Sequence, residues 1–404
     1  MPHTDPPPSG QPDPERAERI HARLTAPGAP FAVIRGERGT LEYADGPRTL
    51  REFVETTWAF GDTLFLVAGE RRYSYGEFFA AASALAVRLS ERYGLRPGDR
   101  AVVAMRNLPE WQIAFWATQL AGLIAVPLNA WWTEDEFTYA LDDCEPGVLL
   151  VDGERMDRVA GWARRAGARV VVFQGQGQLP DGVSIERYED FPAPDPLAAP
   201  PDVEPRPEDD ATILYTAGST GRPRGAVATH LAHAGAALDA RYRAAASALE
   251  RGGIPGMGTA PVIPVTLPFS RLAAFAYFYG AMAAGGTLVL TEAEGEAGTE
   301  GAEGAEGTAY SIDATPVTEL RILAPSGSGD PLLDGATGEL WLRGQPLLRG
   351  YWRDPDATAE AFSGGWFRTG DLAVRREGRV TVVGRAQAAD RPEAADRPEA
   401  ADRP

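Results

Sequence analysis

Residues 211–230 read ATILYTAGSTGRPRGAVATH, and the rest of the chain is best interpreted outward from this stretch. The apolar run at 211–216 predicts a buried β-strand, and a turn of small and hydroxyl-bearing residues follows it. Glycines let the backbone approach a ligand closely, hydroxyls add hydrogen-bond donors, and Arg222 and Arg224 add positive charge. Such a turn suits a polyphosphate. It lacks the Gly-Lys-Ser/Thr of a Walker A loop, and the same composition is compatible with a plain connecting turn.

The chain before this strand alternates short apolar runs with helices that begin at capping residues. The predicted strands are 100–105, 124–128, 147–151 and 169–173. Predicted helices open at Ser74 with Glu77, at Asn107 with Glu110, at Thr133 with Glu136, and near residue 154. Continuous apolar strands between helices are typical of a parallel sheet covered on both faces, so the sequence predicts an α/β fold.

Composition divides the chain into five segments. Residues 1–14 are rich in proline and predicted to be disordered, and 15–290 form the α/β domain, which includes a proline-rich linker at 190–209. Residues 291–309 form an acidic, glycine-rich linker of low complexity, and 387–404 repeat AADRPE and are predicted to be disordered. Between them, 310–386 are predicted to form a small β-rich subdomain with strands at 339–343, 347–351 and 379–383.

The charge and residue usage exclude several classes of protein. The formal net charge of −18 argues against nucleic acid or an anionic membrane surface as a partner. The single cysteine, Cys144, excludes a disulfide framework. We see no secretion signal and no segment long enough to span a bilayer, so a cytoplasmic location is expected. All 39 basic residues are arginine, so this chain cannot supply a lysine-dependent step.

The order of residues around the turn resembles the phosphate loop of adenylate-forming enzymes, the AMP-dependent synthetases and acyl-CoA ligases. The likeness is carried by four groups of residues: Tyr215-Thr216, Gly-Ser-Thr-Gly at 218–221, Pro223-Arg224-Gly225 and Thr229-His230. Ala217 and Arg224 depart from the family's usual residues. Further matches follow in the family's order: GLRPGDRAVVAMRNLPEW (94–111), AGLIAVPLN (121–129), GELWLRG (338–344), GYWRDPDATAEAF (350–362), GWFRTGDLA (365–373) and VTVVGR (380–385). The start, LTAPGAPF (24–31), is similar to the fatty-acid–CoA ligase branch.

The resemblance implies the fold and chemistry of that family. The expected fold is the large N-terminal domain, with parallel sheets covered by helices, followed by the small β-rich subdomain. The expected activity is ATP- and Mg²⁺-dependent activation of a carboxylic acid to an acyl-adenylate, which then forms a thioester with CoA. The likeness to the fatty-acid–CoA ligase branch implies a fatty acid as the substrate. The oligomeric state cannot be read from the sequence.

The resemblance also implies roles for particular residues. The phosphates of ATP would be bound by Thr216, Gly218, Ser219, Thr220, Gly221 and Arg224. Thr216 would also face Mg²⁺. Asp371 would accept hydrogen bonds from the ribose hydroxyls, and Arg385 would lie near the ribose. A turn-capping aspartate and an ordinary surface arginine are the alternative interpretations of these two residues.

Several parts of the family pattern are missing from this sequence. There is no Tyr-Gly-x-Thr-Glu segment, since Tyr279-Gly280 continues differently and Thr318-Glu319 is better interpreted as the start of a strand at 318–323. Arg271, after Pro268-Phe269-Ser270, stands where the family carries a histidine. The C-terminal lid domain and its adenylation lysine are expected to be absent, so the catalytic residue is unknown and activity should be impaired.

Three functions therefore stay open at this point. The first is an acid–CoA ligase with reduced or no activity. The second is a non-catalytic relative that at most binds a nucleotide. The third is an amino-acid adenylation domain, which RNLPEW (106–111) and the N-terminal segment disfavour.

Overall fold

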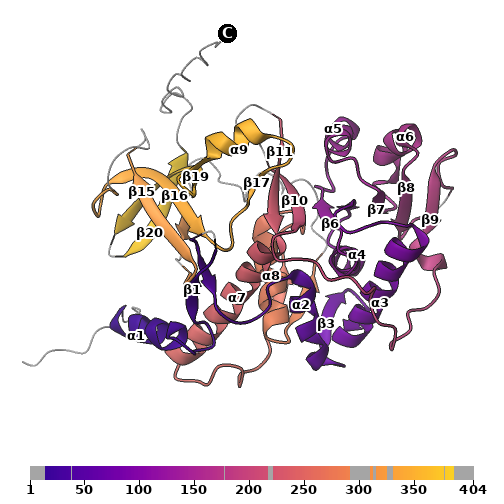
Figure 1. Cartoon of the computed structure of the whole chain (residues 1–404). Coiled ribbons are helices and arrows are strands. Elements are labelled where there is room, and N and C mark those ends of the chain that lie inside the picture. Colours follow the sequence, from indigo (N-terminus) through magenta and orange to yellow (C-terminus); the bar gives the residue numbers. More distant parts are fainter. Residues whose placement is uncertain are drawn as a thin grey trace, which may run out of the picture.

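The computed structural model describes residues 14–37, 39–176, 178–216, 222–291, 310–312, 315–324, 331–376 and 378–385. An eight-stranded sheet forms the centre of the α/β part, in the order β17-β11-β10-β6-β5-β7-β8-β9 (Figure 1). The six strands from β10 to β9 run parallel, whereas β11 and β17 are antiparallel to their neighbours. Their bounds are Arg100–Ala104 (β5), Ile124–Pro127 (β6), Val148–Asp152 (β7), Arg169–Phe173 (β8), Ser184–Arg187 (β9), Asp210–Thr216 (β10), Arg224–Thr229 (β11) and Gly350–Tyr351 (β17).

Helices cover both faces of this sheet, as the continuous apolar strands predict. Along β5 and β7, Val103 and Leu150 face the core under α3 (Tyr75–Val87) and α4 (Pro109–Leu120). Their neighbours Val102 and Leu149 face the core under α5 (Glu134–Cys144) and α6 (Met156–Ala166). Successive side chains of a strand point to opposite faces, so each buried strand supplies both cores. The prediction of a sheet covered on both sides is confirmed (Figure 1).

A second sheet of four strands lies beside α8 (Leu272–Ala283), in the order β12-β13-β3-β4. Its strands are Leu64–Ala68 (β3), Arg71–Ser74 (β4), Val262–Val265 (β12) and Thr287–Leu290 (β13). The long helix α7 (His230–Glu250) packs on α8 and on the N-terminal helix α1 (Pro14–Thr25). Pro14, which the sequence analysis placed in a disordered segment, is therefore the first residue of a helix. The remaining N-terminal elements are β1 (Val33–Arg35), β2 (Leu41–Tyr43) and α2 (Leu50–Glu55).

The C-terminal part forms a third, antiparallel sheet, which Figure 1 shows in orange and yellow. Its strands are Tyr310–Ile312 (β14), Thr318–Leu323 (β15), Thr337–Gly344 (β16), Phe362–Ser363 (β18), Trp366–Arg376 (β19) and Arg379–Arg385 (β20), and α9 covers Pro355–Ala361. The prediction that 347–351 belongs to this β-rich unit is wrong. Its strand, β17, pairs with β11 at the edge of the eight-stranded sheet.

Local capping signals were correct at two of the three predicted helix starts. Ser74 and Thr133 each accept a hydrogen bond from the backbone of the glutamate three residues on, and each glutamate returns the bond. At α4 the cap residue is Leu108, without a side-chain bond. The predicted capping role of Asn107 is therefore wrong, because its side chain bonds to a distant segment.

Candidate functional site

The predicted phosphate loop joins two adjacent antiparallel strands. Thr216 ends β10 and Arg224 begins β11, and the two residues are direct register partners. Side chains of directly opposed residues lie on the same face of an antiparallel pair, so the hydroxyl and the guanidinium stand together at the base of the turn. Gly218, Ser219, Thr220 and Gly221 lie outside the described residues, so their predicted roles stay predictions.

Both ends of this hairpin are anchored to α5. The Tyr215 hydroxyl donates to a carboxylate oxygen of Asp143, and the Tyr139 hydroxyl donates to the Pro223 carbonyl at 3.2 Å. Burial, the largest influence, and the neighbouring Asp143 raise the pKa of Tyr215, so its hydroxyl stays a donor. The guanidinium of Arg222 lies 5.7 Å from the centre of the Tyr139 ring. These contacts fix the strands on either side of the turn.

Arg224 has an acidic neighbour that the sequence analysis did not identify. Its Nε atom lies 3.7 Å from Asp354 Oδ2, and its guanidinium lies 5.8 Å from the centre of the Tyr351 ring. Asp354 is also the N-cap of α9, where its Oδ1 accepts from the Ala357 backbone at 2.9 Å. The sequence signal was available, because an aspartate before Pro355 is a typical helix start.

Asp371 and Arg385, the two residues predicted to lie near a ribose, are brought together on neighbouring strands. They are register partners on β19 and β20, and Arg385 Nε lies 3.3 Å from Asp371 Oδ1. The Asp371 side chain is 17% exposed and that of Arg385 is 79% exposed. The Asp371 amide donates to the Thr369 hydroxyl at 3.0 Å, a local hydrogen bond within β19.

Glu319, a candidate for the missing metal-binding glutamate, forms an ion pair with Arg343 instead. On β15 it accepts two hydrogen bonds from Arg343 of β16, at 2.6 and 2.7 Å. This fork of hydrogen bonds, opposed only in part by burial, lowers the pKa of the Glu319 carboxyl. Within the described residues no group of three or more His, Cys, Asp or Glu side chains is arranged to hold a metal ion.

The segment before Arg271, which departs from the family pattern, is held by Asn107. Its Nδ2 donates to the Leu267 carbonyl and its Oδ1 accepts from the Phe269 amide, both at 2.9 Å. Phe269 is buried against Trp111, with ring centres 4.9 Å apart. Glu110, the other half of the predicted cap, is buried and paired with Arg71 and Gln174. No local pattern of residues predicts these contacts, since the partners lie far apart in the chain.

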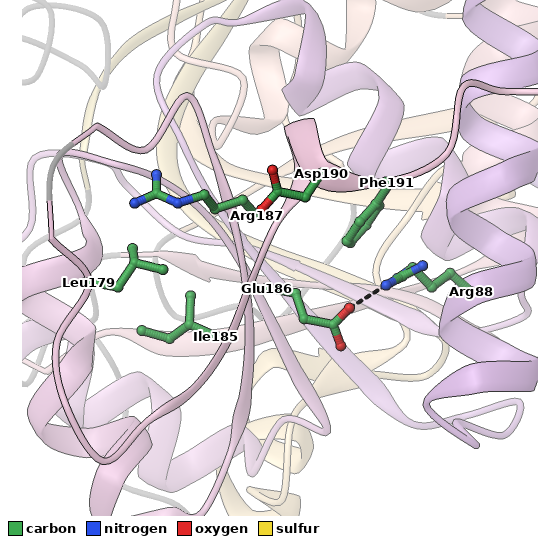
Figure 2. A pocket seen from close by; sticks show the side chains of 7 residues that line it. All are labelled: Arg88, Leu179, Ile185, Glu186, Arg187, Asp190 and Phe191. Carbon is green, nitrogen blue, oxygen red and sulfur yellow. Dashed lines mark hydrogen bonds and ion pairs between the residues drawn. The ribbon is translucent and has the colours of Figure 1, made fainter.

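A cavity of about 240 Å³ lies at the other end of the eight-stranded sheet, beside β9. Figure 2 shows Arg88 pointing at Glu186, with Phe191 and Asp190 next to them. Burial acts against ionisation of Glu186, but its bond with Arg88 and the nearby Arg92 and Arg169 lower its pKa overall. None of the predicted site residues lines this cavity. We assign it no part in the site.

The comparisons with known proteins agree with the fold. The family model described as "AMP-binding enzyme" matches residues 53–299, which include β10, the turn and β11. A feruloyl-CoA synthase from an Amycolatopsis species is 29% identical over 362 residues, covering 69% of this chain and 67% of the relative. A long-chain-fatty-acid–CoA ligase from Mycobacterium tuberculosis is 26% identical over 381 residues, covering 74% and 71%.

Solved structures show the same architecture. The ATP-bound structure of MatB from Rhodopseudomonas palustris superimposes with a TM-score of 0.63 at 22% sequence identity, covering 83% of this chain and 78% of that one. The described part of the chain contains no helix long and apolar enough to cross a membrane.

Proposed function

Because the chain belongs to the AMP-binding enzyme family, we propose that it binds ATP at the β10–β11 hairpin and activates a carboxylic acid as an acyl-adenylate. The observation that carries this proposal is the pairing of Thr216 with Arg224 at the base of the turn. A hydroxyl and a guanidinium there flank a run of glycines and hydroxyls, as a bound triphosphate requires. A fatty acid is the substrate class that the ligase from Mycobacterium tuberculosis suggests.

The proposed phosphate binding at this hairpin rests on the charges of the reactants and of Arg224. A carboxylate that attacks a triphosphate is repelled by it, so fixed donors and cations must offset the developing negative charge. Arg224 supplies a permanent positive charge, and the main-chain N–H groups of 217–221 would supply donors. The anchors of Tyr215 and Pro223 on α5 hold the hairpin in place before the nucleotide binds.

The ribose is assigned to Asp371. A carboxylate can accept hydrogen bonds from both ribose hydroxyls, and the Nε atom of Arg385 lies 3.3 Å from Asp371 Oδ1. Arg385 is the more exposed partner, so it can move without loss of buried contacts. It would then be free to approach the nucleotide.

Of the two residues considered as Mg²⁺ ligands, Thr216 and Glu319, only Thr216 remains a candidate. The ion would neutralise phosphate charge, and Thr216 is the residue that the family resemblance assigns to face it. Glu319 does not fit as a second ligand because both of its oxygens bond to Arg343. We therefore derive no step of the reaction through the metal ion.

Adenylation, and with it the later formation of a thioester with CoA, is proposed to be impaired. The chain contains no lysine, so the positive charge that the family places on an adenylation lysine has no counterpart here. Arg224 is partly neutralised by Asp354, which weakens the phosphate site further. The second candidate, a protein that binds nucleotide without turnover, rests on these two observations.

The test is acid-dependent exchange between ATP and pyrophosphate over a panel of fatty and aryl acids, with and without CoA, together with calorimetric titration of ATP and AMP. We expect nucleotide binding and slow exchange, with little acyl-CoA. The Asp371→Ala variant should bind AMP about tenfold more weakly, and Asp181→Ala, an exposed aspartate on the β8–β9 connection, is the matched control. Nucleotide binding without exchange would favour the second candidate. Absence of nucleotide binding would refute both, and abundant acyl-CoA would refute the impairment.

A further inference from the structure

Residues 252–291 carry a single charged side chain, that of Arg271. The whole chain is 24% charged, so a stretch of this length would ordinarily hold about ten. The stretch contains β12, α8 and β13. Buried residues of this stretch are expected to carry no charge. Other residues of the stretch are exposed, however, and for these the lack of charge is unusual.

One face of α8 is apolar and exposed. The helix buries Phe275, Phe278 and Tyr279 in the core. On its other side Leu272 is 65% exposed, and Ala273 and Ala276 are exposed as well. A helix at the surface of a soluble domain ordinarily presents charged or polar residues to water. This helix presents no charged side chain to water.

The exposed face continues onto the edge of the second sheet. A Cβ atom added at Gly280 would lie 3.9 Å from Ile263 Cδ1, so the side chain of Ile263 on β12 lies beside the helix. Both residues are partly exposed. We call the surface formed by Leu272, Ala273, Ala276, Tyr277, Gly280 and Ile263 the neutral face. It joins a helix and an edge strand without a charged group among its members.

Strand addition is not the natural way to cover this surface. β12 is the last strand of its sheet, and Pro264 in its middle has no N–H group to donate. Proline on an edge strand opposes pairing with a further strand. A helix that packs on α8 meets no such obstacle.

The printed sequence offers no segment of its own to cover the neutral face. The residues outside the described part are 1–13, 38, 177, 217–221, 292–309, 313–314, 325–330, 377 and 386–404. They contain no Leu, Ile, Val, Phe, Tyr or Trp, and Met1 is their one large apolar side chain. These residues therefore do not supply the apolar side chains that would cover the neutral face.

We propose that the neutral face is the contact between two copies of this chain, with the α8 helices packed on each other across a two-fold axis. Small residues at 273, 276 and 280 let two helix backbones approach closely, while Leu272 and Tyr277 supply apolar area. Each copy carries a net charge of −18, so two copies repel over most of their surfaces. A face without carboxylates is where this repulsion is smallest.

Sedimentation equilibrium on the full chain tests the proposal. A dimer has a mass of 86.4 kDa, twice the 43.2 kDa of one chain. Leu272→Glu places a carboxylate in the neutral face and should raise the dimer dissociation constant at least about tenfold. Leu197→Glu, at a side chain 92% exposed in the proline-rich linker, adds the same charge elsewhere and should leave it unchanged. The proposal is overturned if the wild type stays monomeric up to about 100 µM. It is also overturned if the Leu272→Glu protein dimerises as the wild type does.

A cross-linking experiment keeps the proposal testable if the charged variant fails to fold. Cys144 is buried, so a cysteine introduced at the surface is the one available for oxidation. Ala276→Cys near the two-fold axis should form a covalent dimer under mild oxidation, whereas Leu197→Cys should stay largely monomeric. Equal cross-linking of the two variants contradicts the assignment of α8 as the contact.

Discussion

Arg224 and Asp354 form an ion pair between the start of β11, at the base of the predicted phosphate loop, and the N-cap of α9, with Arg224 Nε 3.7 Å from Asp354 Oδ2. Both side chains are about one-third exposed, so water screens the attraction and its contribution to stability is small. The ion pair has a more direct effect on the binding of a phosphate by Arg224. The guanidinium that a phosphate would meet already faces a carboxylate.

Replacing Asp354 with asparagine should therefore strengthen nucleotide binding. Asparagine caps a helix as well as aspartate does, so α9 keeps its start while Arg224 loses its acidic neighbour. We expect ATP to bind about threefold to fivefold more tightly, by calorimetric titration at low ionic strength. Asp354→Ala is the control, since it also frees Arg224 but removes the cap and costs about 1 kcal/mol of folding free energy. Unchanged ATP affinity in both variants would show that Arg224 does not contact phosphate.

Features determined by neighbouring residues could be predicted from the sequence. The capping boxes at Ser74 and Thr133 and the strand at 169–173 involve positions a few residues apart, and the structure has them as predicted. The role of Asn107 could not be predicted, because its partners lie about 160 positions further along the chain. For the same reason β17 was placed in the wrong sheet.

The candidate site was predictable to a similar extent. The turn after β10 was recognised from residue types, and the pairing of Thr216 with Arg224 follows once the strands are antiparallel. The cross-strand pairing of Asp371 with Arg385 needs the register of β19 and β20, which contains a bulge and cannot be counted from the sequence. The partner of Arg224 is a distant residue, so only the folded chain reveals it.

Asn107→Ala should destabilise the segment that carries Phe269. The substitution removes one donor and one acceptor and leaves the buried Phe269 amide without a partner, which costs about 1–3 kcal/mol. Urea denaturation measures the loss, and hydrogen exchange at the Phe269 amide should accelerate. Asn107→Asp keeps the acceptor and should protect that amide. A free energy of unfolding within about 0.3 kcal/mol of the wild type would mean that these bonds are replaced by water at no cost.

His233 should make the fold sensitive to acid. It is buried between Thr212, which contacts Nε2 at 2.8 Å, and the Tyr279 hydroxyl, which contacts Nδ1 at 2.9 Å. Burial lowers the pKa of His233 to about 3, so the folded protein keeps it neutral. The unfolded chain binds a proton below about pH 6.5, so stability is lost as the pH falls from there.

A glutamine at position 233 does not titrate, which isolates this effect. The free energy of unfolding of the wild type, measured relative to His233→Gln, should fall by about 3 kcal/mol between pH 7 and pH 4. Denaturant titrations of both proteins at several pH values give the difference. A constant difference over this range would show that His233 is protonated in the folded state as easily as in the unfolded one.

Asp239 should act in the opposite direction. It lies buried on α7 and accepts a hydrogen bond of 2.6 Å from the Tyr43 hydroxyl of β2. Burial, which outweighs this bond, raises the pKa of Asp239 to about 6. A carboxyl whose pKa is higher in the folded than in the unfolded state favours folding when protonated. Its ionisation therefore destabilises the fold progressively as the pH rises from about 4 through 6.

The Asp239→Asn variant keeps an acceptor for Tyr43 and removes the charge. Relative to the wild type, it should gain about 2.4 kcal/mol of folding free energy between pH 4 and pH 7.5, because only the wild type must ionise a buried carboxyl over that range. Thermal and urea unfolding of the two proteins in parallel give this gain, and the pH dependence of all other groups cancels in the comparison. If the two proteins instead follow parallel curves, Asp239 is already ionised at pH 4 in the folded state, and the junction between α7 and β2 is open to water.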